Sequence, residues 1–206
     1  MKLYDFAFSP NCRKVRAVAY ELGVALEYEH VDLLHGASRS PAFLAKNPNG
    51  RVPVLEDGDL ILWESTAIVR YLAAGSPLVP AAPRAAAEVD RWISWQLAHL
   101  GPAMSKVAFE KIVKKLTGRG APDPVRIAEG TAEFDQLTGI LDHALAGREF
   151  VAGGLTLADF ALAAHYSLAS AAGLELARHR RVESWLARIS ARDSMKRALS
   201  EAQASL

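Results

Sequence analysis

Cysteine is almost absent from this sequence of 206 residues, which contains only Cys12. A single cysteine excludes an internal disulfide framework and is typical of proteins in a reducing compartment. Long hydrophobic runs are also missing, so no segment has the apolar length of a signal-peptide core or of a helix that crosses a bilayer. We therefore expect a soluble, cytoplasmic protein that does not associate with membranes.

An excess of charge of one sign is lacking too. The sequence has 24 Lys and Arg residues against 23 Asp and Glu residues, a formal net charge of +1. Nucleic acids and anionic lipids attract strongly basic surfaces, so neither is expected as a partner. The 6 histidines show no metal-ligand spacing with one another or with Cys12, and no metal is expected.

The N-terminal part of the sequence alternates strand and helix patterns. Short apolar segments predict strands at residues 2–8, 28–33, 52–56 and 60–63, the last two joined by a tight turn at Asp57-Gly58. Helical spacing of apolar residues, with start and stop signals, predicts helices at residues 10–22, 41–46 and 65–74. This order predicts a small mixed sheet flanked by helices, the α/β arrangement of thioredoxin-like domains.

The rest of the sequence has helical patterns only. Residues 76–83 are rich in proline and have the composition of a linker. Ala- and Leu-rich stretches then predict helices at residues 84–116, 124–145, 157–171, 182–190 and 194–204, with a bend at Pro102 and a capping box at Thr156–Asp159. We therefore predict a thioredoxin-like domain at residues 1–75 and an all-helical domain at residues 84–206.

The turn at Ser9-Pro10-Asn11-Cys12 carries the first chemical signal. Ser9 and Pro10 are typical of a helix start, where free N–H groups and the helix dipole favour an anion. The pattern resembles the Cys-x-x-Cys of thioredoxins and glutaredoxins, with the first cysteine replaced by Ser9. A hydroxyl cannot perform disulfide exchange, but it can donate a hydrogen bond to a thiolate that a ligand supplies. Alternatively, Ser9 only caps the helix, and Cys12 is a small buried residue.

Two further segments suggest a ligand groove. Val52-Pro53 stands at the start of a strand, and a cis peptide there would turn the polar backbone groups of Val52 toward a groove; the sequence leaves the isomer open. Glu64-Ser65 stands at a helix N-terminus and suits an amino-acid-like ligand, with Glu64 on its ammonium and Ser65 on its carboxylate. Alternatively, the second pair is a serine cap beside a favourably placed glutamate.

The three segments together resemble those of cytosolic glutathione transferases. Ser9-x-x-Cys12 after a strand, residues 47–55 (Asn-Pro-Asn-Gly-Arg-Val-Pro-Val-Leu) and residues 63–72 (Trp-Glu-Ser-x-Ala-Ile-x-x-Tyr-Leu) occur in the family's order and spacing. The resemblance covers essentially the whole chain, and it is nearest to bacterial, serine-type members with the pattern of the phi and theta classes.

The resemblance implies glutathione as co-substrate and a homodimer, without a metal. Ser9 would stabilise the glutathione thiolate, which then attacks a small hydrophobic electrophile. The implied glutathione-binding residues are Ser9, Arg39, Arg51, Val52, Pro53, Glu64 and Ser65. An electrophile pocket is expected from Phe8, Pro10, Asn11, Met104, Phe109, Ile112 and Val113.

Two other functions remain open from the sequence. One is a glutathione-dependent peroxidase or thiol oxidoreductase, the oxidoreductase using Cys12 as its thiol. The other is a binding protein of the same fold without catalytic activity. The intact set of three glutathione segments favours the transferase over a binding protein.

Overall fold

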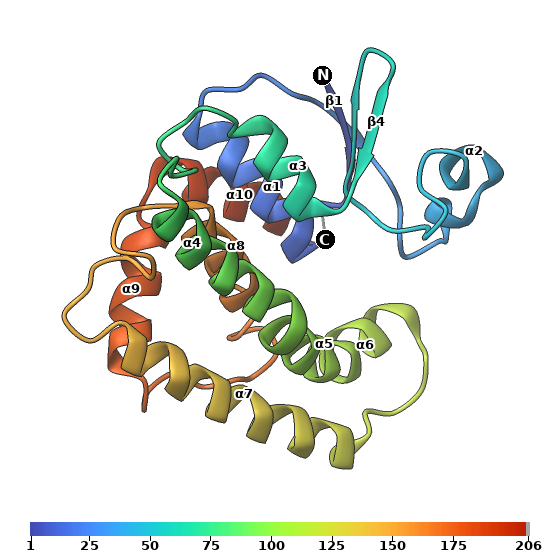
Figure 1. Ribbon diagram of the computed structural model, residues 1–206. Helices are drawn as coiled ribbons and strands as arrows, with labels where there is room; N and C mark the ends of the chain where they lie inside the picture. The colour runs from blue at the N-terminus through green and yellow to red at the C-terminus, as the bar shows by residue number, and fades with distance from the viewer. Residues whose placement is uncertain (205–206) are drawn as a thin grey trace. The chain divides into compact units, whose positions relative to one another are not determined.

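The structure is a computed structural model that describes residues 1–204 (Figure 1). The chain divides into two compact units. The N-terminal unit contains Met1–Val79 together with Ser190 and the described residues after it, and the helical unit contains Pro80–Ile189.

The N-terminal unit is built on a four-stranded sheet in the order β2-β1-β3-β4. Its strands are β1 (Lys2–Asp5), β2 (Glu27–His30), β3 (Val54–Asp57) and β4 (Leu60–Trp63). β1 pairs with β2 in parallel and with β3 antiparallel, and β3 and β4 form an antiparallel hairpin. Three of the four strands are thus shorter than or shifted from the expected segments. The ladder of β3 begins at Val54, two residues later than predicted, since Pro53 directly before it has no backbone N–H to donate to a partner strand.

Helices cover both faces of this sheet. α1 (Pro10–Glu21) packs against α3 (Ser65–Leu72) on one side, and α2 (Pro41–Leu44), preceded by the 3₁₀ turn Ala37–Arg39, lies on the other side (Figure 1). α1 begins with proline at its first position, and Gly23 follows it with a φ of 68°. That angle suits glycine, which has no Cβ to clash in the left-handed region. The predicted thioredoxin-like α/β fold is confirmed.

The last helix, α10 (Asp193–Ala204), belongs to the N-terminal unit. Met195, Ala198 and Ala202 are buried on one face of α10, and the helix packs along α1. The predicted helical domain at residues 84–206 included this segment. In the structure, residues 190–204 group with the sheet instead, because the apolar face of α10 is covered by α1.

The helical unit begins with one continuous helical run. It comprises α4 (Pro83–Trp95), a π-helical turn η2 (Gln96–Leu100), α5 (Gly101–Ala108), a second π-helical turn η3 (Phe109–Val113) and α6 (Lys114–Thr117). Pro102 does not end this run. The π-helical turn directly before it changes the hydrogen-bond register, and such turns accommodate irregularities in a helix.

Three more helices complete the helical unit: α7 (Pro124–Ala144), α8 (Leu157–Tyr166) and α9 (Arg180–Ser190). Every residue of α8 is buried, so this helix forms the centre of the unit's core. The predicted capping box at its start is present, and the Asp159 carboxylate accepts a hydrogen bond of 3.0 Å from the Thr156 backbone N–H.

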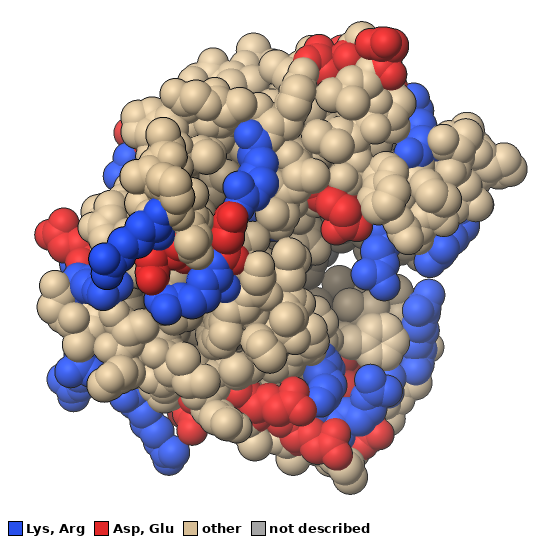
Figure 2. Space-filling model, viewed as in Figure 1, with Lys and Arg blue, Asp and Glu red and all other residues tan. Residues whose placement is uncertain are grey.

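Basic and acidic side chains lie side by side on the face of the molecule that Figure 2 shows. None of the described helices combines the length and the apolar character that a membrane crossing requires.

Candidate active site

Ser9 stands at the junction of β1 and α1, in the N-cap position of the helix. Its backbone N–H donates to the Phe6 carbonyl at 2.8 Å, and its own carbonyl accepts from the Arg13 N–H at 2.9 Å. The Ser9 side chain is half-buried and makes no capping hydrogen bond. The simple capping role that the sequence allowed is therefore not the one this hydroxyl performs.

Positive charge surrounds the position of Ser9. The first turn of α1 contains no acidic residue, and its free N–H groups and helix dipole favour an anion at this end. Arg13 is buried one turn further along, where its guanidinium donates to the Phe8 carbonyl at 3.3 Å. Burial lowers the pKa of Arg13 to about 10, so it remains a cation at neutral pH. A thiolate near Ser9 would be stabilised by both features.

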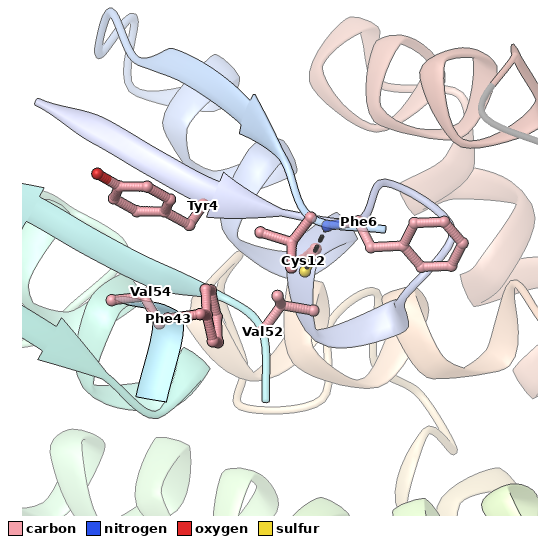
Figure 3. Packing of buried hydrophobic residues seen from close by; sticks show 7 residues of the cluster. Tyr4, Phe6, Cys12, Phe43, Val52 and Val54 are labelled. Atoms are coloured by element: carbon pink, nitrogen blue, oxygen red, sulfur yellow. Dashed lines mark hydrogen bonds between the residues drawn. The ribbon is translucent and has the colours of Figure 1, made fainter. Parts of the chain in front are cut away.

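Cys12 lies beneath this turn and is fully buried. The Phe6 N–H donates to its sulfur at 3.5 Å (Figure 3). Burial raises the pKa of the Cys12 thiol to about 12, although hydrogen bonds from the Phe6 N–H and the Ser9 hydroxyl oppose the rise. Cys12 is thus a protonated, inaccessible thiol at neutral pH, which matches the structural role considered for it.

Val52 belongs to the same hydrophobic cluster as Cys12, which brings the start of β3 to the first turn of α1 (Figure 3). The Val52–Pro53 peptide bond is cis, the isomer that the sequence had left open. The strand ladder begins only at Val54. The backbone N–H and C=O groups of Val52 therefore lie outside the ladder, beside the helix N-terminus.

The loop before Val52 is shaped by Asn47. This buried side chain donates to the Arg51 carbonyl at 2.7 Å and accepts from the Asn49 N–H at 3.0 Å. Gly50 has a φ of 60°, and a Cβ there would lie 2.8 Å from the Arg39 guanidinium. Arg39, predicted only from the resemblance, is thereby placed against this loop.

Both arginines of the predicted glycyl site are exposed. Arg39 donates to the Asn49 carbonyl at 3.3 Å, so its guanidinium is held near the backbone of the loop. Arg51 is exposed on the same loop. Neither side chain is shielded from a ligand by its neighbours.

Glu64 and Ser65 form the third segment, at the start of α3. Glu64 is exposed and has a φ of 71°, a backbone conformation that L-residues rarely adopt. Such angles often occur at ligand-binding turns, where the surrounding structure maintains them. Ser65 is buried, and its hydroxyl donates to Asn11 Oδ1 at 3.2 Å. This bond joins α1 to α3 two residues after Ser9.

The three predicted glutathione segments therefore converge within the N-terminal unit. Asn11 links the helix that begins after Ser9 to Ser65, and the buried cluster links Cys12 to Val52. Together the segments contribute a hydroxyl that caps no backbone N–H, backbone groups outside the strand ladder, a carboxylate and two exposed basic side chains. This set of groups can bind a peptide that carries an ammonium, carboxylates and a thiol.

The expected electrophile-pocket residues differ in burial. In the N-terminal unit, Phe8, Pro10 and Asn11 are half-buried around Ser9. In the helical unit, the half-buried residues Phe109, Ile112 and Val113 lie on the π-helical turn η3. Met104 is 2% exposed and belongs to the core of the helical unit.

Three residues near the site, for which the sequence predicted no role, are buried: Arg13, Lys14 and Asn47. Two consecutive cations just after a helix start are usually interpreted as solvated, and only tertiary contacts show that these two are not. Asn47 had a local signal, because Asn before Pro is typical of a shaped turn. Within residues 1–204, no group of three or more His, Cys, Asp or Glu side chains could hold a metal ion.

Comparison with known proteins agrees with this geometry. Residues 3–80 match the family described as "Glutathione S-transferase, N-terminal domain". The chain is 38% identical over 165 residues to glutathione S-transferase 3 of Zea mays, covering 77% of this chain and 73% of the relative. The crystal structure of glutathione transferase F7 from Populus trichocarpa is 29% identical, with a TM-score of 0.90 and 98% of each chain covered.

Glutathione S-transferase I from mais, in complex with an atrazine glutathione conjugate, superimposes with a TM-score of 0.90. It is 26% identical and covers 100% of this chain, which covers 99% of it. The sequence identity, the fold and the three converging segments lead to one conclusion: the chain belongs to the glutathione S-transferase family of enzymes.

Proposed function

We propose that this protein is a serine-type glutathione transferase of the phi and theta pattern, in which Ser9 holds the sulfur of glutathione as a thiolate. The observation that carries the proposal is the Ser9 hydroxyl, which stands at the N-terminus of α1 and caps no backbone N–H. The hydroxyl would donate its hydrogen bond to the sulfur of the ligand. Ser9 itself forms no covalent bond to the substrate.

The physical effect of this hydrogen bond is a change in ionisation. A free thiol has a pKa of about 8.5, so only a few per cent is thiolate at neutral pH. A decrease of about two pKa units makes the thiolate the main species. The hydroxyl, the helix dipole and the Arg13 guanidinium all act in that direction, and holding the sulfur next to an electrophile supplies the remainder by proximity.

The other segments are proposed to hold the rest of the glutathione molecule. The backbone of Val52, before Pro53, would pair with the cysteinyl residue, because its N–H and C=O lie outside the ladder. Glu64 would bind the ammonium of the γ-glutamyl group, and Ser65 with the N-terminus of α3 would bind its carboxylate. Arg39 and Arg51 would bind the glycyl carboxylate.

The electrophile is proposed to be a small hydrophobic molecule. Phe8, Pro10 and Asn11 flank Ser9, and Phe109, Ile112 and Val113 offer apolar surface in the helical unit, whose core contains Met104. The atrazine glutathione conjugate of the mais relative is a product of this type, and supports the proposal. A bound thiolate could also attack a peroxide, so peroxidase activity is compatible with the same site.

Titration of the bound thiol tests the role of Ser9. Ultraviolet absorbance of the thiolate is followed against pH for glutathione bound to the wild type and to Ser9→Ala. We expect a depressed thiol pKa in the wild type and a return toward the free value in the variant, with kcat at neutral pH reduced by about tenfold to a hundredfold. An unchanged thiol pKa in Ser9→Ala would refute the assigned role.

Ser40→Ala is the matched control, because Ser40 is also a helix N-cap but its side chain does accept the Phe43 N–H, at 3.3 Å. This variant should lower the free energy of unfolding by about 1 kcal/mol and leave the thiol pKa unchanged.

Conjugation of chlorodinitrobenzene by the wild type would rule out a non-catalytic binding protein. Absence of both conjugation and retention on immobilised glutathione would support such a binding protein.

A thiol oxidoreductase that uses Cys12 is disfavoured by the burial of this residue and by its raised thiol pKa. A homodimer and a cytoplasmic location belong to the same proposal, and the mass in solution tests the first. The bacterial origin expected from the resemblance stays a prediction.

A further inference from the structure

Lys14 is a fully buried lysine that the proposed function does not use. Lysine is almost never fully buried unless its ammonium has a partner of opposite charge. In the described part of the chain, Lys14 has no ion pair within 4.0 Å, and its Nζ donates one hydrogen bond, to Thr66 Oγ1 at 3.1 Å. Burial lowers the pKa of Lys14 to about 7, while the negative charge of Glu64 opposes the decrease.

Lys14 and Asn11 stand three residues apart and therefore on one face of α1. They contact two consecutive residues in the first turn of α3: Asn11 accepts from the Ser65 hydroxyl, and Lys14 donates to the Thr66 hydroxyl. Directly before these residues stands Glu64, with its positive φ. The helix that begins after Ser9 is thus tied twice to the turn proposed to receive the γ-glutamyl group.

A purely structural role does not account for a lysine at this position. A methionine has nearly the same length and would fill the space without removing an ammonium group from water. Replacing a buried charged group by a well-packed apolar one is often neutral or stabilising. Stability therefore does not explain the Lys14 amino group, whereas its hydrogen bond to Thr66, next to the Glu64-Ser65 turn, suggests a role at that turn.

We propose that Lys14 is a positioning residue for glutathione: its Nζ holds Thr66, and through Thr66 the Glu64-Ser65 turn, in the geometry that receives the γ-glutamyl group. This inference rests on the proposed function, because it concerns the same site. In this proposal Lys14 acts through Thr66 and contacts neither the sulfur nor the electrophile. Its effect should therefore appear in the binding of glutathione and be absent from the thiolate chemistry.

Steady-state kinetics of Lys14→Met, Thr66→Val and the double variant test this inference. We expect each single variant to raise the KM for glutathione by about three- to tenfold, as the loss of one hydrogen bond predicts, with kcat within about twofold of the wild type. The KM for glutathione of the double variant should be no higher than that of either single variant, because each substitution removes the same hydrogen bond. Thr66→Ser keeps the hydroxyl and should retain the wild-type KM.

Thermal unfolding separates positioning from structural support. Lys14→Met should have an unchanged or higher Tm although its KM for glutathione is raised. Substitution of a purely structural residue would instead lower both the stability and the activity of the protein. Lys106→Met is the matched control, since Lys106 pairs with Glu133 on the surface of the helical unit, and its KM for glutathione should not change. If Lys14→Met does not fold, the comparison of Thr66→Val with Thr66→Ser still decides the question.

The outcomes distinguish this inference from the proposed function. A wild-type protein that neither binds nor conjugates glutathione would overturn both. A wild-type protein that conjugates glutathione, with variants whose KM for glutathione is unchanged, would overturn the role of Lys14 alone. A lower Tm in Lys14→Met with an unaltered KM would identify a structural residue and overturn the inference as well.

Discussion

Glu64 has the most unusual backbone in the described chain, with a φ of 71° and a ψ of 108° in a residue that is not glycine. Conformations of this kind are unfavourable by about 1–3 kcal/mol and persist where surrounding contacts impose them. The Ser65–Asn11 and Thr66–Lys14 hydrogen bonds, directly after Glu64, are such contacts. Glu64 therefore combines a local penalty with a position suited to a ligand ammonium.

Substitution of Glu64 should separate stability from binding. Glu64→Gly removes the unfavourable conformation and should raise the free energy of unfolding by about 1 kcal/mol, while the loss of the carboxylate should weaken glutathione binding by about tenfold or more. Urea unfolding and calorimetric titration with glutathione measure the two effects. Glu64→Gln is the control: it should weaken binding without the gain in stability. A Gly variant less stable than the Gln variant would contradict this explanation.

Among single residues, the polar groups with local signals were the predictable ones. Ser9 and Ser65 stood at helix starts, and the motif around Val52-Pro53 predicted a ligand groove. The burial of Arg13 and Lys14 was not predictable, because cations just after a helix start are normally solvated. Lys14 contacts a segment far away in the sequence, at Thr66.

At the scale of the elements, α8 shows how one capping residue can organise a core. The fully buried Asp159 carboxylate accepts hydrogen bonds from the Thr156 N–H at 3.0 Å, the Val151 N–H at 3.0 Å and the Trp185 indole N–H at 2.9 Å. Asp159 thereby joins the start of α8 to the preceding loop and to α9. The sequence predicted the first of these contacts and could not predict the other two.

Asp159→Ala should therefore destabilise the protein more than loss of an ordinary cap. Four buried donors would lose their acceptor, since the Thr156 hydroxyl also donates to Asp159, at 3.3 Å. We expect the free energy of unfolding to fall by about 3–5 kcal/mol. Asp123→Ala is the matched control in the same unit: Asp123 caps α7 at the surface, and its loss should lower the free energy of unfolding by about 1 kcal/mol. Equal losses in urea unfolding would contradict the role assigned to Asp159.

Most elements followed from local patterns. The Asp-Gly turn joins β3 to β4, and proline stands at the first or second position of α1, α2, α4 and α7. The two π-helical turns were not predicted, since they change only the hydrogen-bond register of a segment that remains helical. The shorter β1 and the later start of β3 reflect ladder pairing, which depends on the partner strand.

At the scale of the whole molecule, the C-terminal helix returns to support the helix that carries the site. Arg192 and Ser194 donate to Glu21 at the end of α1, and Arg16 binds both Asp5 and Glu201. α10 is thereby attached to α1 through ionic groups at two places as well as through its apolar face. The network lies within the N-terminal unit and couples the end of the chain to its beginning.

These ionic contacts should make the stability depend on pH in acid. Burial alone would raise the pKa of Glu21 and of Glu201, but hydrogen bonds from Arg192 and Ser194 to Glu21, and from Tyr20 and Arg16 to Glu201, outweigh it and lower both below the ordinary value of 4.5. A carboxylate with a lowered pKa in the folded state stabilises the protein above the unfolded pKa. That stabilisation is lost as the pH falls from 4.5 through the folded pKa.

Glu21→Gln with Glu201→Gln tests this dependence. Urea unfolding from pH 7 to pH 3 should show a smaller loss of stability on acidification in the double variant than in the wild type, because two carboxylates no longer take up protons on unfolding. The exposed pair Glu149→Gln with Glu175→Gln is the control and should follow the wild-type curve. Parallel curves for the wild type and the first double variant would show that the contacts between α10 and α1 do not govern acid stability.

The sequence by itself determined the order of the elements, the thioredoxin-like class of the first unit and the three segments that carry the resemblance to the family. These depend on caps, turns and apolar periodicity, which act between residues close together in the chain. The tertiary structure decided that α10 joins the sheet unit, that Asn11 meets Ser65 and that Lys14 is buried beside Thr66. Such contacts form only when distant segments pack together, and no local sequence pattern determines which polar side chains are then buried.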